Sequence, residues 1–453
     1  MPERLRDRDG LSGGLASILA MARLLTRLDL RGVRGDLRRL LPAPRLAGEG
    51  PVQTVREVLA QVKVGGDAAV AELTQRFDRV TPASLRVPPE DVRAALEAVP
   101  PALRRALEEA ARAVKGFYQA ERDAHRGFEH IGADGVVTRE VPVPVSRAGC
   151  YVPGGRAPLA STVVMTAVPA RVAGVDEVVV CSPPGPDGRA PAAVLAAAAI
   201  AEVDEVYAVG GAQAIAAMAY GTETVKRADV IVGPGNVYVA AAKREVADAV
   251  GIPTSFAGPS EVVVIADGTV PIEWAVMDVI VQAEHGPDGL AWLITWDPEV
   301  AAGADAVCER LLAESPRRAE TASTLEEGGY VVLVRDFQQA AEVSNAIAPE
   351  HLELLSANCE DLVPLIRNAG AVFVGPHATA AYGDYLAGPS HVLPTYGTAR
   401  FASALSVVDF QKRVHAIEIG EEAAKLLAGP LSAIAGAEGL WAHARSAEMR
   451  AEQ

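Results

Sequence analysis

Residues 204–236 read DEVYAVGGAQAIAAMAYGTETVKRADVIVGPGN, and this stretch decides the fold class. Two short runs rich in β-branched residues each end in a glycine turn, and an Ala-rich segment lies between them. A similar run, DEVVVC, occupies residues 176–181. Continuous apolar runs of this length are typical of parallel strands that are covered on both faces. Their alternation with helical segments predicts a doubly wound βαβ domain.

A second series of strands and helices follows further along the chain. The runs EVVVIAD, LAWLITW, YVVLV and AGAVFVG predict strands at 261–267, 290–296, 330–334 and 369–375. Residues 50–125 are expected to be helical, because apolar side chains recur there every three or four positions. We therefore expect an α/β protein with two Rossmann-like, doubly wound domains that face a central crevice. Helical segments are expected at both ends of the chain.

Bulk composition excludes several classes of partner. Half of the 453 residues are hydrophobic, and the formal net charge is -16, which repels nucleic acids and anionic membranes. Arg23 and Arg27 interrupt the apolar run near the N-terminus, and no window reaches the roughly 18 consecutive apolar residues of a membrane span. The four cysteines form no CxxC pair, which argues against a disulfide framework or a thiolate metal site. These features predict a cytoplasmic protein.

Glycine-rich turns follow two of the predicted strands. VGGAQAIAA and VGPGNVYVA could each present backbone N–H groups at a helix N-terminus to a pyrophosphate. The second turn departs from the dinucleotide fingerprint, because Tyr238 stands where a third glycine is expected. A tight turn without any ligand is an equally valid interpretation. A third loop, AGCYVPGGRAPLAS, places Tyr151 before Gly154 and Gly155 and could border the same crevice.

Several side chains could ligate a metal ion. Gln282 and His285 are spaced i, i+3 in the last turn of a predicted helix, which ends at Gly286. Asp384 and His391 share a later loop, and His443 lies on a terminal helix after Glu438. A mixed nitrogen and oxygen set of this kind suits zinc. Each position also has a simpler interpretation as a solvated helix end, a turn cap or an ordinary surface residue.

The stretch IAPEHLELL, residues 347–355, places Glu350 and His351 in apolar surroundings. Burial would raise the pKa of the carboxyl and make it a usable base near neutral pH. We expect the pair in a turn or at a helix start, where adjacent side chains do not face each other. They would then serve two separate proton transfers rather than one dyad. Ligands of α/β sheets collect at carboxyl ends of strands, so we expect the chemistry in loops after residues 209, 232, 267 and 375.

A series of motifs resembles the histidinol dehydrogenase family in order and approximate spacing. The motifs are AGCYVPGG, VGGAQAIAA, GPGNVYVA, AGPSEVVVIAD, QAEHGPD, APEHLEL, GDYLAGPSHVLPT and AEGLWAHA. The resemblance runs from about residue 22 to about residue 450. It implies an enzyme that oxidises L-histidinol to L-histidine through L-histidinaldehyde, the last step of histidine biosynthesis, with reduction of two NAD. One zinc ion per subunit and a homodimer are also implied.

The resemblance assigns a role to each matching residue. The implied catalytic acid–base residues are Glu350 and His351. The implied zinc ligands are Gln282, His285, Asp384 and, from the partner subunit of the dimer, the position of His443. Substrate contacts are implied for the four zinc ligands and for Ser260, His351, His391 and Glu438. The positions that match NAD contacts are Tyr151, Gln213 and Asn236.

Domain limits follow from these assignments. Residues 1–49 are expected to form an N-terminal helical segment, with the first 20 or so as a tail and Met21 as an alternative start. We expect 50–149 and 261–405 to form the domain with the metal and acid–base residues, 150–260 the NAD-binding domain, and 406–453 a helical dimerisation segment.

Two other functions compete with this hypothesis. A zinc hydrolase could use Glu350 as the base for a metal-bound water, but it leaves the glycine-rich turns unused. A non-catalytic, two-lobed binding protein would fit the paired α/β units, but it gives no reason for the Glu350-His351 pair.

Overall fold

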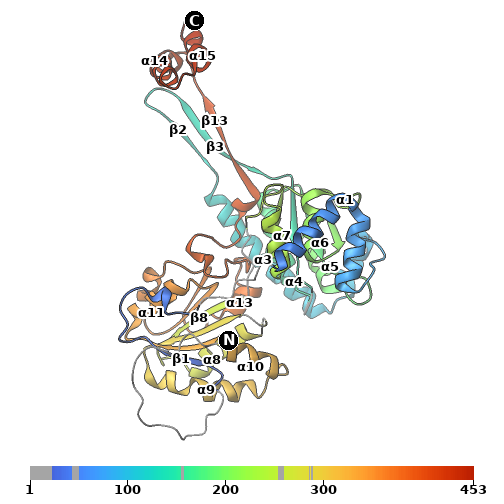
Figure 1. Cartoon of the computed structure of the whole chain (residues 1–453), viewed down its shortest axis with the longest axis vertical. Helices are drawn as coiled ribbons and strands as arrows, with labels where there is room; N and C mark the ends of the chain where they lie inside the picture. The colour runs from blue at the N-terminus through green and yellow to red at the C-terminus, as the bar shows by residue number, and fades with distance from the viewer. Residues whose placement is uncertain are drawn as a thin grey trace.

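Two α/β bodies and a projecting arm make up the chain (Figure 1). This computed structural model describes residues 23–42, 50–154, 158–253, 260–284, 286 and 289–452. Each body contains a parallel sheet, with four strands in one and six in the other, and a three-stranded antiparallel sheet forms the arm. The predicted fold class, an α/β protein with two doubly wound domains, is confirmed, and the C-terminal end is helical.

The four-stranded sheet has the order β6-β5-β4-β7. Its strands are β4 (Arg147–Tyr151), β5 (Glu177–Ser182), β6 (Glu205–Ala208) and β7 (Val230–Val232). Successive side chains point to opposite faces, so Val178 and Val180 enter one core while Val179 and Cys181 enter another. Burial on both faces explains why these strands are continuous apolar runs in the sequence.

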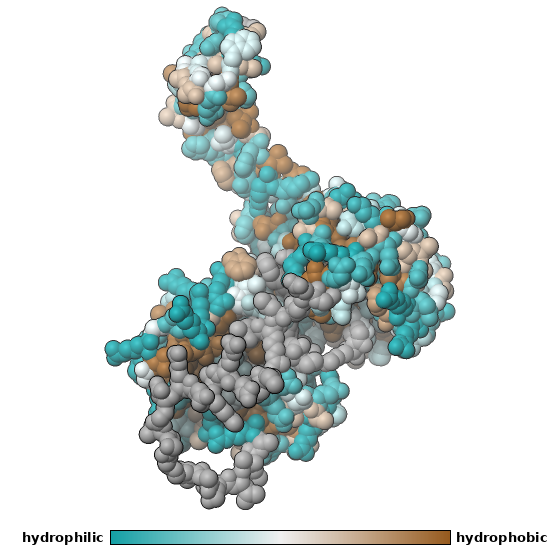
Figure 2. Space-filling model, viewed as in Figure 1, coloured by the Kyte–Doolittle hydropathy of each residue, from teal (hydrophilic) through white to brown (hydrophobic). Residues whose placement is uncertain are grey.

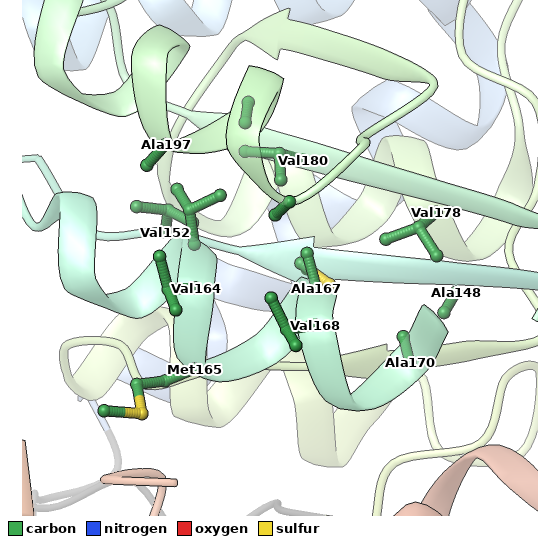
Figure 3. Close-up of a cluster of buried hydrophobic side chains, with 14 of the residues drawn as sticks. Ala148, Val152, Val164, Met165, Ala167, Val168, Ala170, Val178, Val180 and Ala197 are labelled. Carbon is green, nitrogen blue, oxygen red and sulfur yellow. The ribbon is translucent and has the colours of Figure 1, made fainter. Parts of the chain in front are cut away.

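Helices cover both faces of this sheet. One face carries α2 (Pro89–Ala98), α3 (Pro101–Ala124), α4 (Ala160–Ala173) and α5 (Ala192–Ile200). The other carries α1 (Gly50–Asp78), which kinks at Gly66, with α6 (Gly211–Tyr220) and α7 (Val237–Glu245). Figure 3 shows part of the core between this face and its helices, where Val164 and Ala167 of α4 belong to the same cluster as Val178 and Val180 of β5.

The position of α1–α3 differs from the predicted domain grouping. We expected residues 50–149 to join residues 261–405, yet α1 packs on α6 and α7, α2 on α5, and α3 on α4. The periodicity of an amphipathic helix identifies the face that it buries but not the sheet that receives this face. These three helices therefore belong to the body of the four-stranded sheet.

The six-stranded sheet has the order β1-β10-β9-β8-β11-β12, and every pair in it is parallel. Its strands are β1 (Thr26–Asp29), β8 (Glu261–Ala266), β9 (Leu290–Thr295), β10 (Gly329–Leu333), β11 (His351–Leu355) and β12 (Ala371–Val374). Two of these strands were not predicted. β1 lies in the segment expected to be helical, and β11 lies where a turn or a helix start was expected.

Helices also cover both faces of the six-stranded sheet. One face packs against α8 (Ile272–Ala283), α9 (Pro298–Leu312) and α10 (Arg318–Gly328). The other packs against α11 (Phe337–Ile347), α12 (Cys359–Leu362) and the short helix η1 (Leu37–Arg39). The remaining short helices are α13 (Ala380–Tyr385), η2 (Val363–Leu365), η3 (Thr398–Arg400) and η4 (Val407–Phe410).

The arm consists of β2 (Phe128–Ile131), β3 (Val137–Pro144) and β13 (Gln411–Glu418), with α14 (Glu421–Ala437) and α15 (Trp441–Ala451) at its tip (Figure 1). β13 pairs antiparallel with β3. A strand in the C-terminal segment was not predicted, because the strands of the arm have no buried face and so no apolar periodicity. Among the described residues, no helix combines the length and the apolar character needed to cross a membrane.

Candidate active site

The expected acid–base residues lie at the amino edge of the six-stranded sheet. Ser260 precedes β8 and Glu350 precedes β11, and His351 at the start of β11 pairs with Val262 of β8. The prediction that this chemistry would follow the carboxyl ends of strands is therefore wrong for Ser260 and Glu350. Because α8 runs back from the carboxyl edge to the amino edge, it delivers Gln282 to the same edge.

Glu350 and His351 lie close to each other and to Asp384. The distance from His351 Nδ1 to Glu350 Oε2 is 3.7 Å, and that from His351 Nε2 to Asp384 Oδ1 is 3.8 Å. Glu350 and His351 are each only 5% exposed. Glu350 lies in a bend and His351 in a strand, and the expectation that the two side chains would not face each other is wrong. They enter a strand, not a helix, so the helical geometry behind that expectation does not apply.

Burial dominates the electrostatics of these carboxyls. It raises the pKa of Glu350 well above its usual value, although the backbone N–H of Glu261 donates to Glu350 Oε2 over 3.2 Å and favours the charged form. Burial also raises the pKa of Asp384 to about 6. Carboxyls that are costly to ionise in isolation are stabilised by a proton or by a bound cation.

Gln282 offers an amide group at this edge. It is 4% exposed in the last turn of α8, as predicted, and its Nε2 atom has no hydrogen-bond partner within the described part of the chain. A Cβ atom on Gly289 would lie 3.7 Å from this Nε2 atom, so the glycine leaves room beside the amide. A buried polar group without a partner calls for an unseen ligand, water or ion. Together with the partly buried Asp384, it fits the oxygen and nitrogen donors that zinc accepts.

The other expected metal ligands are not assembled by one chain alone. His285 lies outside the described residues. His443 is exposed on α15, and Glu438 is exposed at the end of α14, so both belong to the arm tip, well away from α13 in Figure 1. In the ranges that the structure describes, no group of three His, Cys, Asp or Glu side chains is arranged to hold a metal ion.

His391 lies where the two α/β bodies meet. Its Nε2 atom is 3.1 Å from Thr162 Oγ1 of α4, and its Nδ1 atom is 3.0 Å from the backbone oxygen of Asp384. Tyr118 of α3 fixes the same loop, since its hydroxyl donates to the Leu405 carbonyl over 2.7 Å and accepts from the Ser390 N–H over 3.0 Å. His391 therefore connects the Asp384 region with the body of the four-stranded sheet.

The expected cofactor residues gather at the carboxyl edge of the four-stranded sheet. Tyr151 ends β4, and its hydroxyl accepts a hydrogen bond of 3.1 Å from the Gly211 N–H at the start of α6. Gln213, in the first turn of α6, is 1% exposed, and its Nε2 atom has no partner among the described residues. β4 lies between β5 and β7, where the strand order reverses, and such points bind ligands in open α/β sheets.

The turn after β7 completes this edge. Gly233 has a φ of +105°, and a Cβ atom there would lie 2.1 Å from the Tyr151 carbonyl oxygen, so only glycine fits. Asn236 is exposed and caps α7, accepting hydrogen bonds of 3.1 Å from the N–H groups of Tyr238 and Val239. The positive end of the α7 helix dipole therefore faces solvent at this edge.

Two buried charged side chains near these edges were not predicted. Lys243 of α7 is fully buried and donates to the carbonyl of Gly233, and burial lowers its pKa to about 7. Glu261 begins β8, and burial raises its pKa to about 7. The signal in the sequence was a charged residue next to an apolar run, AAAK and EVVVIA, which is common at solvated ends of elements too.

Known proteins resemble this chain over most of its length. The model of the histidinol dehydrogenase family matches residues 44–451. The chain is 45% identical to the histidinol dehydrogenase of Ralstonia nicotianae over 96% of its own length and 99% of that protein. It is 49% identical to that of Methylococcus capsulatus, over 88% of this chain and 91% of the relative.

A solved structure extends the similarity to three dimensions. The crystal structure of histidinol dehydrogenase from Elizabethkingia anophelis superimposes with a TM-score of 0.90 at 32% identity, and the match covers 95% of this chain and 98% of that one. The family motifs thus occur on the family's fold, over nearly the whole length of both chains. The chain belongs to the histidinol dehydrogenase family.

Proposed function

We propose that this protein oxidises L-histidinol to L-histidine in two NAD-dependent steps at a zinc site that a second copy of the chain completes. The observation that carries the proposal is the convergence of His351 on Glu350 and Asp384, at 3.7 and 3.8 Å, beside the loop of His391 that reaches the other body. Family membership supports the reaction, and the contacts support the residue roles.

His351 is the proposed base of both oxidations. It would take the hydroxyl proton of histidinol while the carbon-bound hydrogen leaves as hydride to the nicotinamide, which gives the aldehyde, NADH and one proton. Its low exposure keeps bulk water from competing for that proton. In the second oxidation the imidazole of His351 would take a hydroxyl proton from the hydrated aldehyde.

Glu350 is the proposed base for the hydration between the oxidations. A water molecule must add to the aldehyde carbon before a second hydride can leave, and a carboxylate that accepts the water proton speeds this addition. The hydrogen bond from Glu261 N–H fixes Glu350 Oε2, and burial raises the pKa of Glu350 well above its ordinary value, which makes its carboxylate a stronger base. Two oxidations and one hydration explain why two proton acceptors lie together.

A zinc ion would be held by Gln282, His285 and Asp384 and by the partner position of His443. The test of fit is the unpartnered, buried amide of Gln282, at the sheet edge where the partly buried carboxyl of Asp384 meets His351. When bound, zinc supplies a Lewis acid that orients the imidazole and amine of histidinol without taking part in redox chemistry. Ser260, His391 and Glu438 are the remaining proposed substrate contacts.

NAD would bind at the carboxyl edge of the four-stranded sheet. Tyr151, Gln213 and Asn236 are the proposed contacts, and the unpartnered Gln213 Nε2 atom offers a donor at this edge. The N-terminal turns of α6 and α7 begin here, and their backbone N–H groups suit a pyrophosphate in a protein whose net charge is -16.

The arm supports a homodimer. A two-helix tip on a narrow antiparallel sheet buries little by itself, and Trp441 remains 76% exposed, Leu426 65% and Ile434 64%. Figure 2 shows brown, hydrophobic residues along this projecting arm. Exposed aromatic side chains also border the Asp384 helix, where Tyr382 and Tyr385 are more than half exposed. We propose that the arm tip of one copy covers this region of the other, bringing His443 and Glu438 to its site.

Two further points complete the proposal. All four cysteines are free thiols in buried positions, which supports a reducing, cytoplasmic location. The alternative of a zinc hydrolase has no support in the family assignment. The absorbance of NADH formed on addition of L-histidinol distinguishes oxidation from hydrolysis. Absence of NADH with a folded, zinc-loaded protein would refute the proposed reaction.

A further inference from the structure

Glu353 is a buried acid that the proposed chemistry does not use. It lies in the middle of β11 and is 0% exposed. Leu352 and Leu354 on either side enter the core on the other face of the sheet, and Leu355 enters the core beneath α8. The alternation of side chains therefore directs Glu353 and His351 to the α8 face. An isolated carboxylate in such a place is costly, so it requires a partner or a proton.

Only one of its two oxygens has a donor. Glu353 Oε1 accepts a hydrogen bond of 2.6 Å from the N–H of Ala380, whereas Oε2 has no donor among the described residues. The carboxyl of Asp278 on α8 binds Thr379, the neighbour of Ala380, and so lies within hydrogen-bonding reach of Glu353. Burial first, and the hydrogen bond with Asp278 second, raise the pKa of Glu353 to about 10. Two ionised carboxylates cannot bond to each other, but a single proton on Glu353 Oε2 turns this oxygen into a donor.

Asp278 continues the connection to α13. The hydroxyl of Thr379 donates to Asp278 Oδ1 over 2.8 Å. The same hydroxyl accepts from the N–H of Ala381 over 3.4 Å and so caps the first turn of α13. Because it already accepts there, its own hydrogen is free for Asp278. The path from Glu353 through Asp278 and Thr379 thus returns to the helix turn whose Ala380 N–H binds Glu353.

The three elements in this loop of hydrogen bonds carry proposed site residues. β11 carries His351 on the same face as Glu353, α8 carries Gln282 one turn after Asp278, and α13 carries Asp384 one turn after Ala380. Any change in the spacing between α8 and α13 would move the amide of Gln282 relative to the carboxyl of Asp384.

We propose that Glu353 and Asp278 share one proton and act as positioning residues, which hold β11, α8 and α13 at the spacing that the metal and substrate site needs. This inference rests on the proposed function only for what the spacing serves. The shared proton itself follows from the contacts of the pair. Glu353 donates to Asp278 through Oε2 and accepts from Ala380 through Oε1, and the pair keeps one negative charge.

Amide substitutions test the shared proton through hydrogen-bond direction. Glu353→Gln keeps an acceptor for Ala380 and a donor for Asp278. Asp278→Asn keeps an acceptor for Thr379 and offers a donor to an ionised Glu353. Each single variant also preserves the single negative charge of the pair. The double variant places two amide NH2 groups against each other and leaves no acceptor between them.

Zinc affinity and the KM for histidinol should therefore respond non-additively. We expect the zinc dissociation constant and the KM of each single variant to remain within about threefold of the parent values. In the double variant, each constant should rise roughly tenfold more than the product of the two single effects. Zinc affinity is measured by competition with a chromophoric chelator, well below the Tm of every variant. Glu360→Gln on α12 is the matched control, because that glutamate is exposed. Multiplicative effects, or a loss in Glu353→Gln alone equal to that of the double variant, would overturn the inference.

Infrared spectroscopy tests the proton without reference to zinc or activity. The spectrum of the parent minus that of Glu353→Gln at pH 7 should contain the carbonyl stretch of a protonated carboxylic acid, and Asp278→Asn should abolish it. Carboxylate bands in this difference spectrum would contradict the inference even if the double variant failed to fold. Should the parent bind no zinc, the proposed metal site fails, whereas the infrared result still decides the shared proton.

Discussion

His351 Nε2 lies 3.8 Å from Asp384 Oδ1, although His351 begins β11 and Asp384 lies on α13, beyond the next strand. This relationship joins a proposed base to a proposed metal ligand in a buried environment. A ring nitrogen beside a carboxyl can receive a proton, and the carboxyl can hold a cation that orients the substrate. The base and the metal ligand must lie within a few ångströms of the same substrate. The fold brings them together at the amino edge of the six-stranded sheet.

Replacing His351 tests its role as the base. His351→Asn removes the proton acceptor while leaving a polar side chain of smaller size. We expect kcat to fall by roughly a hundredfold to ten-thousandfold, the usual contribution of a positioned general base. Zinc content, measured by atomic absorption, should stay at the parent value. An unchanged kcat would reject the assignment of His351.

Replacing Glu350 tests the hydration step separately. Glu350→Gln retains an acceptor for the Glu261 N–H but cannot take a proton from water. Rapid-mixing absorbance should then show one NADH per active site at close to the parent rate, followed by a second NADH slowed by roughly a hundredfold or more. Glu342→Gln, at an exposed position of α11, is the control. Equal slowing of both phases would assign Glu350 to the first oxidation instead.

The shared site can be tested by mixing two inactive variants. His443→Ala removes a ligand from the arm, and His351→Asn removes the base from the body. In heterodimers one of the two sites carries neither substitution, so activity should return to about a quarter of the parent value for random exchange. Native mass spectrometry measures the extent of subunit exchange. No recovery despite complete exchange would show that His443 serves the site of its own chain.

The pH dependence of stability tests the burial of Glu261. Its pKa is about 7 in the folded protein against an ordinary value of 4.5. Between these values the folded state binds more protons than the unfolded state, so stability falls as pH rises from 4.5 to 7 and then levels off. Glu261→Gln lacks this loss. The difference in free energy of unfolding between the variant and the parent should therefore grow across the same window, by roughly 3 kcal/mol in favour of the variant.

The measurement for Glu261→Gln is the apparent Tm of metal-free protein from pH 4.5 to 8. A carboxyl whose pKa does not depend on the Glu261 charge, such as Asp384, affects both proteins alike and cancels in the comparison. Parallel Tm curves for the variant and the parent would mean that Glu261 has an ordinary pKa.

Most of the strands that the sequence predicted are buried on both faces, and β12, where Val372 and Val374 are exposed, is the exception. β5, β8 and β9 are unbroken apolar runs and were located to within one or two residues. β11 was missed because His351 and Glu353 interrupt its apolar pattern. Both are buried through contacts with α8 and α13, which depend on tertiary structure. β1 and β13 were missed for the opposite reason, since exposed strands carry no apolar periodicity.

Sequence motifs indicated the residues of the candidate site but not where in the fold they meet. Motifs identified Glu350, His351 and Asp384, and helix spacing placed Gln282 in the last turn of α8. The edge of the sheet on which they meet was predicted incorrectly, because the general rule for carboxyl ends of strands does not apply to the loops that enter β8 and β11. Glu353 and Lys243 were not recognised, since an acidic or basic letter next to an apolar run does not reveal burial.

The amount of NADH formed per L-histidinol consumed, with and without a chelator, tests the central claim most directly. We predict two NADH for each histidinol, L-histidine as the product, and loss of both after chelation, with recovery on addition of zinc. One NADH per substrate, or full turnover in chelated protein that contains no metal, would contradict the proposed zinc-dependent oxidation in two steps.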